Sequence, residues 1–514
     1  EVQIRMKPEE AGDEELLRRC ASRAVAVSLE RVLRVDVVRR SIDARQREVL
    51  FQLTVGVHID EIENKGGVFV PAYRDVSDGE VVIVVGAGPA GLFAALRLIE
   101  RGFRPIVLER GKAVEDRKRD LNRLYKTGLV DGDSNFGFGE GGAGTFSDGK
   151  LYTRSKKRGD VRRAMEILVF HGADERILTD AHPHVGTDKL PGVIVNMRKT
   201  IERYGGEIRF NARVSDILIR DHCVCGVVVG EGEMEARHLI LATGHSARDV
   251  YRMLERRSVG MEAKDFAVGL RLEHPQYDID CMQYHRNTGR GEWLPAAEYS
   301  FVTNVEGRGV YSFCMCPGGV IVPAATGPCE QVVNGMSSSS RNTAWANSAM
   351  VTAIGKAELE GMGYRGLFGG MDFQEFLEGR AWKEGGGGLY APAQVLTDFI
   401  AGRESVSLPS TSYKPGVRSS CLHRWLPEVV YRRLSVGLDF FGRKTSGFVT
   451  ERGLLLGVET RTSSPLRIPR TERFMHPEIG GLYPCGEGSG YAGGIISAAM
   501  DGENCAENVG SVVF

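Results

Sequence analysis

Residues 81–109, VVIVVGAGPAGLFAALRLIERGFRPIVLE, combine a strand, a glycine turn, a helix and an acidic residue. The run Val81–Val85 is apolar, β-branched and too short for a helix, so we predict a buried parallel strand. Gly86, Gly88 and Gly91 follow it as G-x-G-x-x-G. These glycines permit the tight turn, the approach of a pyrophosphate and close packing of the helix on the strand. This stretch predicts an α/β fold that binds a dinucleotide.

The end of this unit narrows the cofactor to FAD or NAD. A second predicted strand, 105–108, ends at Glu109, whose carboxylate can accept ribose hydroxyls and would repel the extra phosphate of NADP. Pro89, Ala90 and Arg110 are further candidate contacts, because the helix N-terminus offers free N–H groups to phosphates. The alternative is a strand and turn without a ligand, which the combined pattern disfavours.

A second glycine-rich segment, GFGEGGAGTFSDGK at 137–150, offers more donors to the same cofactor. Its backbone N–H groups, hydroxyls and ammonium group can contact a pyrophosphate or a flavin edge. The candidates are Gly142, Gly144, Thr145, Ser147 and Lys150. The alternative is a flexible surface loop, which the alternation of glycines with polar donors disfavours.

Two further strands are expected to return toward the cofactor. In LILATGH at 239–245, the small residues Ala242, Thr243 and Gly244 let the backbone pass close to a ligand. In FNARV at 210–214, a strand edge ending at Val214 could pair with an adenine. Each segment is equally compatible with a plain buried strand.

The segment GLYPCGEGSGYAGGIISAAMDG at 481–502 is predicted to form a strand, a glycine turn and a helix. The candidate contacts are Gly486, Glu487, Gly493, Gly494 and Ile495. The helix N-terminus can face the pyrimidine end of a flavin, where negative charge accumulates on reduction. A late segment that returns to the first cofactor site favours FAD over NAD, because FAD is long and must be held at both ends.

Taken together, these motifs resemble the glutathione reductase-type flavoproteins. More narrowly, GEGGAGTFSDGKL, HVGTDKL, FCMCPGG, ETRTSSP and GEGSGYAGGI resemble the uncharacterised bacterial FAD-dependent, "NAD(FAD)-utilizing" dehydrogenases. The resemblance extends over nearly the whole chain. It implies FAD as the cofactor and supplies no substrate.

Redox chemistry outside the flavin has one candidate pair. The chain has no C-x-x-C, and no second dinucleotide-binding unit that would hold NAD(P)H is recognised, so either a nicotinamide binds only transiently as electron donor or the electrons come from another donor. Cys314 and Cys316, two residues apart before Pro317-Gly318, are candidates for a redox or nucleophilic role. The alternative is a pair of small buried thiols. His182 and His184 suggest no third ligand, so no metal is expected.

Composition excludes several classes of protein. The net charge of −1 gives no general attraction to nucleic acid or to anionic membranes. No apolar run approaches the roughly 18–20 residues that span a bilayer, and no signal peptide is evident. The 10 cysteines lack a regular spacing, which favours reduced thiols in a cytoplasm.

The pattern along the chain predicts three domains. Residues 1–76 should form a small α+β domain of ferredoxin-like type, with a helix over 14–33 and strands at 35–41 and 48–58. Residues 77–265 with 451–514 should form a Rossmann-like FAD-binding domain of the glutathione reductase type. Residues 266–450 should form an inserted α+β substrate domain.

These observations predict a cytoplasmic FAD-dependent oxidoreductase that passes a hydride between an organic substrate and the flavin N5 atom. One alternative is a flavin-dependent RNA-modifying protein, with residues 1–76 as its RNA-binding module. The neutral charge and the lack of a basic and aromatic stripe argue against it. Another alternative is a flavin-binding redox sensor without turnover. The pattern specifies neither the substrate nor the oligomeric state.

Overall fold

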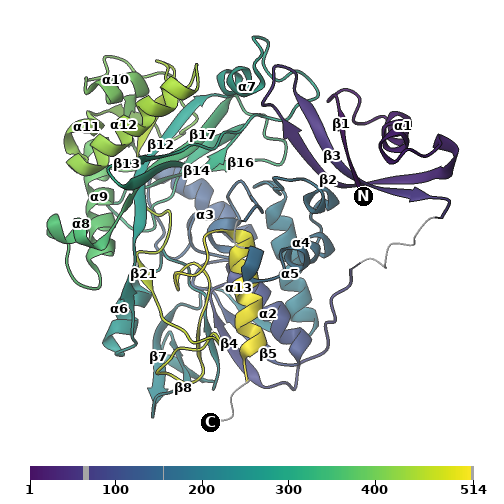
Figure 1. Cartoon of the computed structure of the whole chain (residues 1–514). Coiled ribbons are helices and arrows are strands. Elements are labelled where there is room, and N and C mark those ends of the chain that lie inside the picture. Colours follow the sequence, from purple (N-terminus) through teal and green to yellow (C-terminus); the bar gives the residue numbers. More distant parts are fainter. Residues whose placement is uncertain (62–68, 154–155, 511–514) are drawn as a thin grey trace.

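The strand predicted at 81–85 lies at the centre of a five-stranded parallel sheet in the computed structural model, which describes residues 1–61, 69–153 and 156–510 (Figure 1). Its strands are β4 (Val81–Val85), β5 (Arg104–Leu108), β6 (Glu207–Arg209), β10 (Leu239–Leu241) and β22 (Leu482–Pro484). They follow the order β22-β10-β4-β5-β6, with every pairing parallel. The sheet and the elements that cover it are called the nucleotide unit.

Helices and a small antiparallel sheet cover the two faces of the parallel sheet. They are α2 (Pro89–Arg101), α3 (Val114–Thr127), α4 (Val161–Phe170), α5 (Leu190–Arg203), α6 (Arg248–Arg256), α13 (Ile495–Asn508), β7 (Val214–Arg220), β8 (Cys223–Val229) and β9 (Gly232–Glu235). Val82 and Val84 pack with α2, α4, α5 and α13, whereas Ile83 and Val85 pack with α6, β7 and β8. This alternation explains the uninterrupted apolar run of β4, which is buried on both faces.

Helices α2 and α13 run side by side, although about 400 residues separate them in the sequence (Figure 1). A Cβ on Gly502 of α13 would lie 2.1 Å from the backbone oxygen of Ala90 in α2. Glycine at 502 therefore permits this close approach. Across the described part of the chain, none of the helices combines the length and apolar character that a membrane crossing requires.

A second, seven-stranded sheet forms the centre of the cap unit. Its strands are β12 (Phe266–Pro275), β13 (Val302–Val305), β14 (Arg308–Cys316), β17 (Trp345–Ile354), β18 (Ala391–Val395), β19 (Val417–Ser419) and β20 (Leu454–Glu459). The order is β13-β14-β17-β12-β20-β18-β19, antiparallel except for the β18–β19 pair. Helices from the same stretch pack on this sheet, and their buried side chains form one cluster that also includes Ile4, Met6 and Leu17 from the start of the chain.

The other elements of the cap are its helices and two short pairings of strands. The helices are α7 (Gln276–Tyr284), α8 (Lys356–Gly361), α9 (Gly369–Gly385), α10 (Leu396–Ala401), α11 (Leu422–Trp425) and α12 (Glu428–Lys444). Strands β15 (Gly319–Pro323) and β16 (Val333–Ser337) form a hairpin. Strands β11 (Glu262–Ala263) and β21 (Leu466–Arg467) pair where the chain enters and leaves the cap.

Strand β20 corrects one predicted domain boundary. We expected residues 451–514 to join the nucleotide unit, but β20 lies between β12 and β18 in the sheet of the cap. Leu455 pairs with Leu272 on one side and with Gln394 on the other. A short buried run such as LLLGVE shows its burial in the sequence but not the sheet that it joins. The cap unit therefore extends from 266 to 459.

The first residues form a separate unit of one helix and three strands, drawn in purple in Figure 1. The elements are β1 (Val2–Met6), α1 (Glu14–Val25), β2 (Val32–Asp43) and β3 (Leu50–Ile59), with the antiparallel order β1-β3-β2. This arrangement corresponds to the first half of the expected ferredoxin-like fold. Its second helix and fourth strand are not present in the described residues 1–61 and 69–76.

The predicted helix over 14–33 is too long, and β1 was not expected. Helix α1 ends at Val25, because Ala26 adopts a left-handed conformation with φ of 54° and its N–H closes the last turn. The unit contacts the cap next to β2, where a ring nitrogen of His285 lies 3.0 Å from the oxygen of Ala44, and it contacts the nucleotide unit through β2 itself. The Arg40 N–H donates to the oxygen of Thr179 at 2.9 Å, and the Ala181 N–H donates to the oxygen of Arg40 at 2.8 Å.

Candidate functional site

Three glycine segments from distant parts of the chain meet at the N-termini of α2 and α13. A Cβ on Gly142 would lie 3.2 Å from the Cα of Gly88. A Cβ on Gly144 would lie 3.3 Å from Pro89 Cγ and 3.5 Å from Ile495 Cγ1. The structure therefore brings the candidates of the first, second and last glycine segments to one place.

Open space lies over several of these glycines, in contrast to the tight contacts between the segments. A Cβ on Gly244, Gly493 or Gly494 would meet no atom within 4 Å, and one on Gly88 would meet its nearest atom at 4.0 Å. The first N–H groups of α2 and α13 lack intrahelical acceptors. The open space beside these glycines lies next to two helix N-termini, whose free N–H groups bind anions. This arrangement fits an elongated anionic ligand such as FAD.

Glu109 lies at the end of β5 with only 5% of its surface exposed. Its Oε2 accepts from the Ala87 N–H at 2.8 Å, and its Oε1 accepts from the N–H groups of Gly111 at 2.9 Å and Gly139 at 3.0 Å. An ionised carboxylate has about four lone-pair sites, so one acceptor site is left for a ribose hydroxyl. The side chain therefore connects the first glycine turn to the second.

Arg110 is engaged by protein partners rather than left free for a phosphate. Its guanidinium pairs with Asp133 at 2.7 Å and with Asp249 at 2.9 Å, and lies 4.3 Å from the ring centroid of Phe138. Two carboxylates neutralise its charge in place.

The hydroxyls of the second glycine segment are also used within that segment. Thr145 Oγ1 donates to the oxygen of Glu140 at 2.7 Å, and Ser147 Oγ donates to the oxygen of Gly144 at 2.7 Å. These side chains stabilise the loop, and its backbone forms the surface facing Gly88.

The strand predicted in 239–245 lies beside the first glycine turn, but the strand predicted over 210–214 is wrong. Residues 210–213 connect β6 to β7, because Asn211 adopts a left-handed conformation with φ of 52°, and only Val214 belongs to a strand. A Cβ on Gly86 would lie 2.4 Å from the backbone oxygen of Ala242, and the Ala242 N–H donates to the oxygen of Val85 at 2.9 Å. The Cα of Thr243 would also lie close to this Cβ on Gly86, at 3.3 Å. Val214 begins β7 and is buried, two residues after Ala212, whose N–H donates to the oxygen of Glu109.

Glu487 faces a histidine that the sequence did not single out. Its Oε1 lies 3.7 Å from Nδ1 of His245, and the other ring nitrogen lies 3.1 Å from the oxygen of Arg461. A Cβ on Gly488 would lie 2.6 Å from the oxygen of Gly244, so the two turns touch. His245 directly follows the Ala-Thr-Gly segment, and this position is the signal that could have identified it.

Arg117 is the most deeply buried site residue that sequence reasoning missed. Its guanidinium, 0% exposed, donates to the oxygens of Asn135, Phe136 and Glu140 at 2.8–2.9 Å. Burial lowers its pKa to about 10. The residue lies in the charged run EDRKRD, which is typical of a solvated helix face, so its inward position has no local signal.

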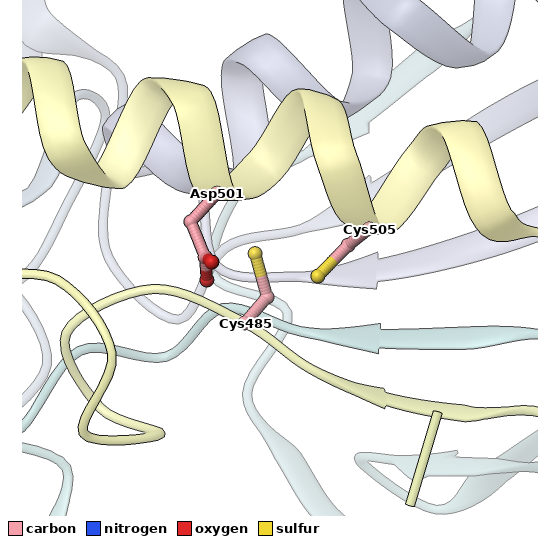
Figure 2. Close-up of side chains that lie close together, drawn as sticks. All are labelled: Cys485, Asp501 and Cys505. Carbon is pink, nitrogen blue, oxygen red and sulfur yellow. The ribbon is translucent and has the colours of Figure 1, made fainter. Parts of the chain in front are cut away.

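Beneath the last glycine turn lie Cys485, Asp501 and Cys505, whose ligand atoms are all within 4.8 Å of one another (Figure 2). Asp501 accepts from the Gly486 N–H at 2.7 Å and from both terminal nitrogens of Arg470 at 2.5 and 2.9 Å. The arginine already supplies the cation that a metal would provide. The hydrogen bond with Cys505 and burial raise the pKa of the Cys485 thiol well above its ordinary value. The cluster is therefore suited to holding the turn against α13.

Cys314 and Cys316 lie at a β-bulge in β14, in the cap unit. Arg271 donates to the oxygen of Cys314 at 2.8 Å and to the sulfur of Cys316 at 3.4 Å. The two thiols are not joined by a disulfide. Cys314 is exposed whereas Cys316 is only 2% exposed, and desolvation by the surrounding protein raises the pKa of both thiols. A thiolate nucleophile is therefore scarce near neutral pH.

Comparisons with known proteins identify the family of this chain. The family model of the pyridine nucleotide-disulphide oxidoreductases matches residues 80–266, and that of the FAD-dependent protein, C-terminal domain-like, matches residues 265–462. A domain of unknown function matches residues 1–58. The class that fold and site define is thus an FAD-dependent oxidoreductase.

A relative extends this assignment to the whole chain. An uncharacterized protein of Clostridium beijerinckii is 40% identical over 516 residues, which cover 97% of this chain and 96% of that protein. The chain belongs to the same uncharacterised family of FAD-dependent proteins.

Solved structures with partial likeness include two named enzymes. L-proline dehydrogenase from P. horikoshii is 13% identical and covers 85% of this chain and 94% of its own, with a TM-score of 0.34. Glycine oxidase from Bacillus cereus is 13% identical and covers 85% and 96%, with a TM-score of 0.30. The assignment to FAD-dependent oxidoreductases rests on the family models and on the glycine site.

Proposed function

We propose that the protein passes a hydride between an organic substrate and the N5 atom of FAD, held where the nucleotide unit faces the cap. The observation that carries this proposal is the meeting of Gly88, Gly142 and Ile495 beside glycines with open space above them. We also propose that the nucleotide unit is of the glutathione reductase type, in a cytoplasmic protein. When bound, FAD supplies the hydride chemistry, and the chain binds, orients and excludes water.

Each end of the cofactor has its own set of residues in this proposal. Glu109 accepts a ribose hydroxyl, and the N-terminus of α2 binds the pyrophosphate. The turn at Gly142 and Gly144 covers the pyrophosphate from the other side. The N-terminus of α13, beginning at Ile495, stabilises negative charge on the reduced pyrimidine.

The electron donor is proposed to be NADH or NADPH, bound transiently. The test is the visible spectrum of the FAD-loaded protein under anaerobic addition of NADH, NADPH and dithionite. Loss of the flavin absorbance with either nucleotide, followed by steady turnover with an acceptor, is expected. Steady turnover would also exclude the alternative of a flavin-binding redox sensor without turnover.

Other outcomes of this experiment distinguish the alternatives. Reduction by dithionite but by neither nucleotide would contradict the nicotinamide donor while leaving the flavin site intact. A protein that takes up no FAD would overturn the whole proposal. RNA binding that weakens steeply with salt would favour the RNA-modifying alternative over a small-molecule substrate.

A further inference from the structure

Strand β1 lies at the free edge of the sheet in the unit of residues 1–61. In the order β1-β3-β2, it pairs on one side with β3, from Val2 opposite Val55 to Met6 opposite Phe51. Within the described part of the chain, its other side pairs with no strand and makes no backbone hydrogen bond. Such an edge presents unpaired N–H and C=O groups and is a ready template for another strand.

The opposite edge of this sheet is protected, whereas β1 is not. Strand β2 has two register shifts against β3, and the backbone of Arg40 bonds to residues 179 and 181 of the nucleotide unit. Strand β1 keeps a continuous register with β3 and contains no proline, and its charged residue Arg5 is exposed rather than turned inward. Bulges, prolines, inward charges and covering segments are the features that prevent strand edges from pairing. The edge of β1 is therefore open to a further strand.

A complete ferredoxin-like fold fills this position with a strand of its own. There the fourth strand pairs antiparallel with the first, and the described residues 1–61 and 69–76 contain no such strand. A strand in this position must also match the alternation of β1, in which Ile4 and Met6 are buried with α1 while Gln3 and Arg5 are exposed. Its direction and its alternation of side chains are therefore both specified.

Strand β1 meets both requirements when it pairs with a second copy of itself. In an antiparallel pair centred on Ile4, the facing residues of the two copies are Glu1 and Lys7, Val2 and Met6, Gln3 and Arg5, and Ile4 with itself. Opposite charges face each other at Glu1 and Lys7, and like charges do not. The contact of Lys7 with Glu48 of its own chain, at 3.5 Å, is exposed and weak, so it does not compete strongly. A pair centred on Arg5 would instead place two guanidinium groups directly opposite each other.

We propose that the protein forms a symmetric dimer in which the β1 strands of two copies pair antiparallel and join their three-stranded sheets into one sheet. A two-fold axis perpendicular to the sheet relates the copies and keeps both α1 helices on one face. One pair of five-residue strands buries less than the roughly 1,200 Å² of a stable interface, so the dimer forms only at micromolar concentrations. This inference concerns assembly and does not depend on the flavin reaction.

The test is sedimentation equilibrium of the full-length, FAD-loaded protein over roughly 1–200 µM, a range suited to weak interfaces. Gln3→Lys places an ammonium opposite Arg5 of the second copy and should raise the dissociation constant of the dimer at least threefold. Gln3→Glu places a carboxylate opposite the same guanidinium and should lower it at least threefold. The double variant Gln3→Lys with Arg5→Glu should return it toward the wild-type value, because opposite charges face each other again.

Gln46→Lys and Gln46→Glu are the matched controls, because Gln46 is an exposed glutamine in the turn between β2 and β3. They change the net charge equally and should leave the dissociation constant as in wild type. Hydrogen exchange gives a second measurement. The amides of residues 2–6 should exchange more slowly at the high end of the concentration range in wild type, and less so in Gln3→Lys.

A protein that stays monomeric over the whole range would overturn the inference. A dimer whose dissociation constant responds to neither Gln3 variant would also overturn it, because the copies would then meet at another surface. Both results leave flavin reduction by NADH or NADPH intact, so failure of the inference is separate from failure of the proposed function.

Discussion

Gly88 of the first glycine turn lies against Gly142 of the second, since a Cβ on Gly142 would lie 3.2 Å from the Cα of Gly88. The Gly141 N–H supports this approach by donating to the oxygen of Ala87 at 2.8 Å. Two segments about 50 residues apart thus form one surface, and a side chain at either glycine would occupy space next to it.

Gly142→Ala should weaken FAD binding at least tenfold. The residue has a φ of +60°, so alanine would cost about 1 kcal/mol in strain, and its Cβ would also press on Gly88. Gly128→Ala is the matched control, because Gly128 has a φ of +70° with nothing within 4 Å of its Cβ. Both variants should lose similar stability in thermal denaturation, but only Gly142→Ala should show a larger dissociation constant for FAD. Equal FAD affinities would contradict the crowding argument.

Glu109→Gln should destabilise the fold by roughly 1–3 kcal/mol and weaken FAD binding. Three backbone N–H groups converge on the carboxylate, and an amide offers them only one oxygen and directs an NH₂ group at the others. Urea denaturation and FAD titration measure the two effects. Glu115→Gln, which removes only an exposed pair with Arg198, should cost less than about 1 kcal/mol. If both variants lose the same stability, the buried hydrogen bonds of Glu109 are not decisive.

Arg117→Met should be among the most destabilising substitutions in the nucleotide unit, at roughly 3–5 kcal/mol. Methionine replaces the volume of the stem but leaves the oxygens of Asn135 and Phe136 without the guanidinium donor and the oxygen of Glu140 with Thr145 alone. Arg119→Met, two residues away and 81% exposed, is the control. Urea denaturation of both variants gives the midpoint concentrations, which are compared provided that the unfolding free energy depends on urea concentration with the same slope in each. A wild-type midpoint for Arg117→Met would refute the role of the guanidinium.

His274 should make the protein lose stability in acid. Burial lowers its pKa to about 4 from an ordinary value near 6.5, and Nε2 lies 2.9 Å from the oxygen of Phe448. The unfolded chain therefore binds a proton at higher pH than the folded one, so stability is fully present above pH 6.5 and falls between pH 6.5 and about 4.

His274→Gln isolates this contribution, because glutamine can donate to the same oxygen without titrating. The difference in unfolding free energy between wild type and variant should change by up to about 1.4 kcal/mol per pH unit in that window. His222→Gln, at an exposed histidine, is the control. A difference that does not vary between pH 7 and 4 would show that His274 does not titrate on unfolding.

Local patterns predicted the elements that hold the cofactor. The apolar run at 81–85, the glycine spacing and Glu109 identified a strand, turn and helix, and the family models confirm the FAD-dependent class. The helix expected at 495 is present and extends to Asn508. Such features are local, because backbone conformation and burial over a few residues specify them.

The environment of individual polar side chains could not be predicted in the same way. Arg117 lies in a charged run yet is fully buried, and Arg110 is engaged by two carboxylates. Strand β20 joins the cap, although it follows the segment expected to close the substrate domain. Each of these depends on partners that are distant in the sequence.

The sequence by itself determined that this chain contains a strand, glycine turn and helix, a late glycine segment and an acidic residue at the end of the second strand, because spacing and residue type set those conformations locally. The tertiary structure decided that the three glycine segments of Gly88, Gly142 and Ile495 meet and that the guanidinium of Arg117 is buried among backbone oxygens. Long-range packing makes these decisions, since burial and charge pairing are properties of residues brought together only when the sheets and helices assemble.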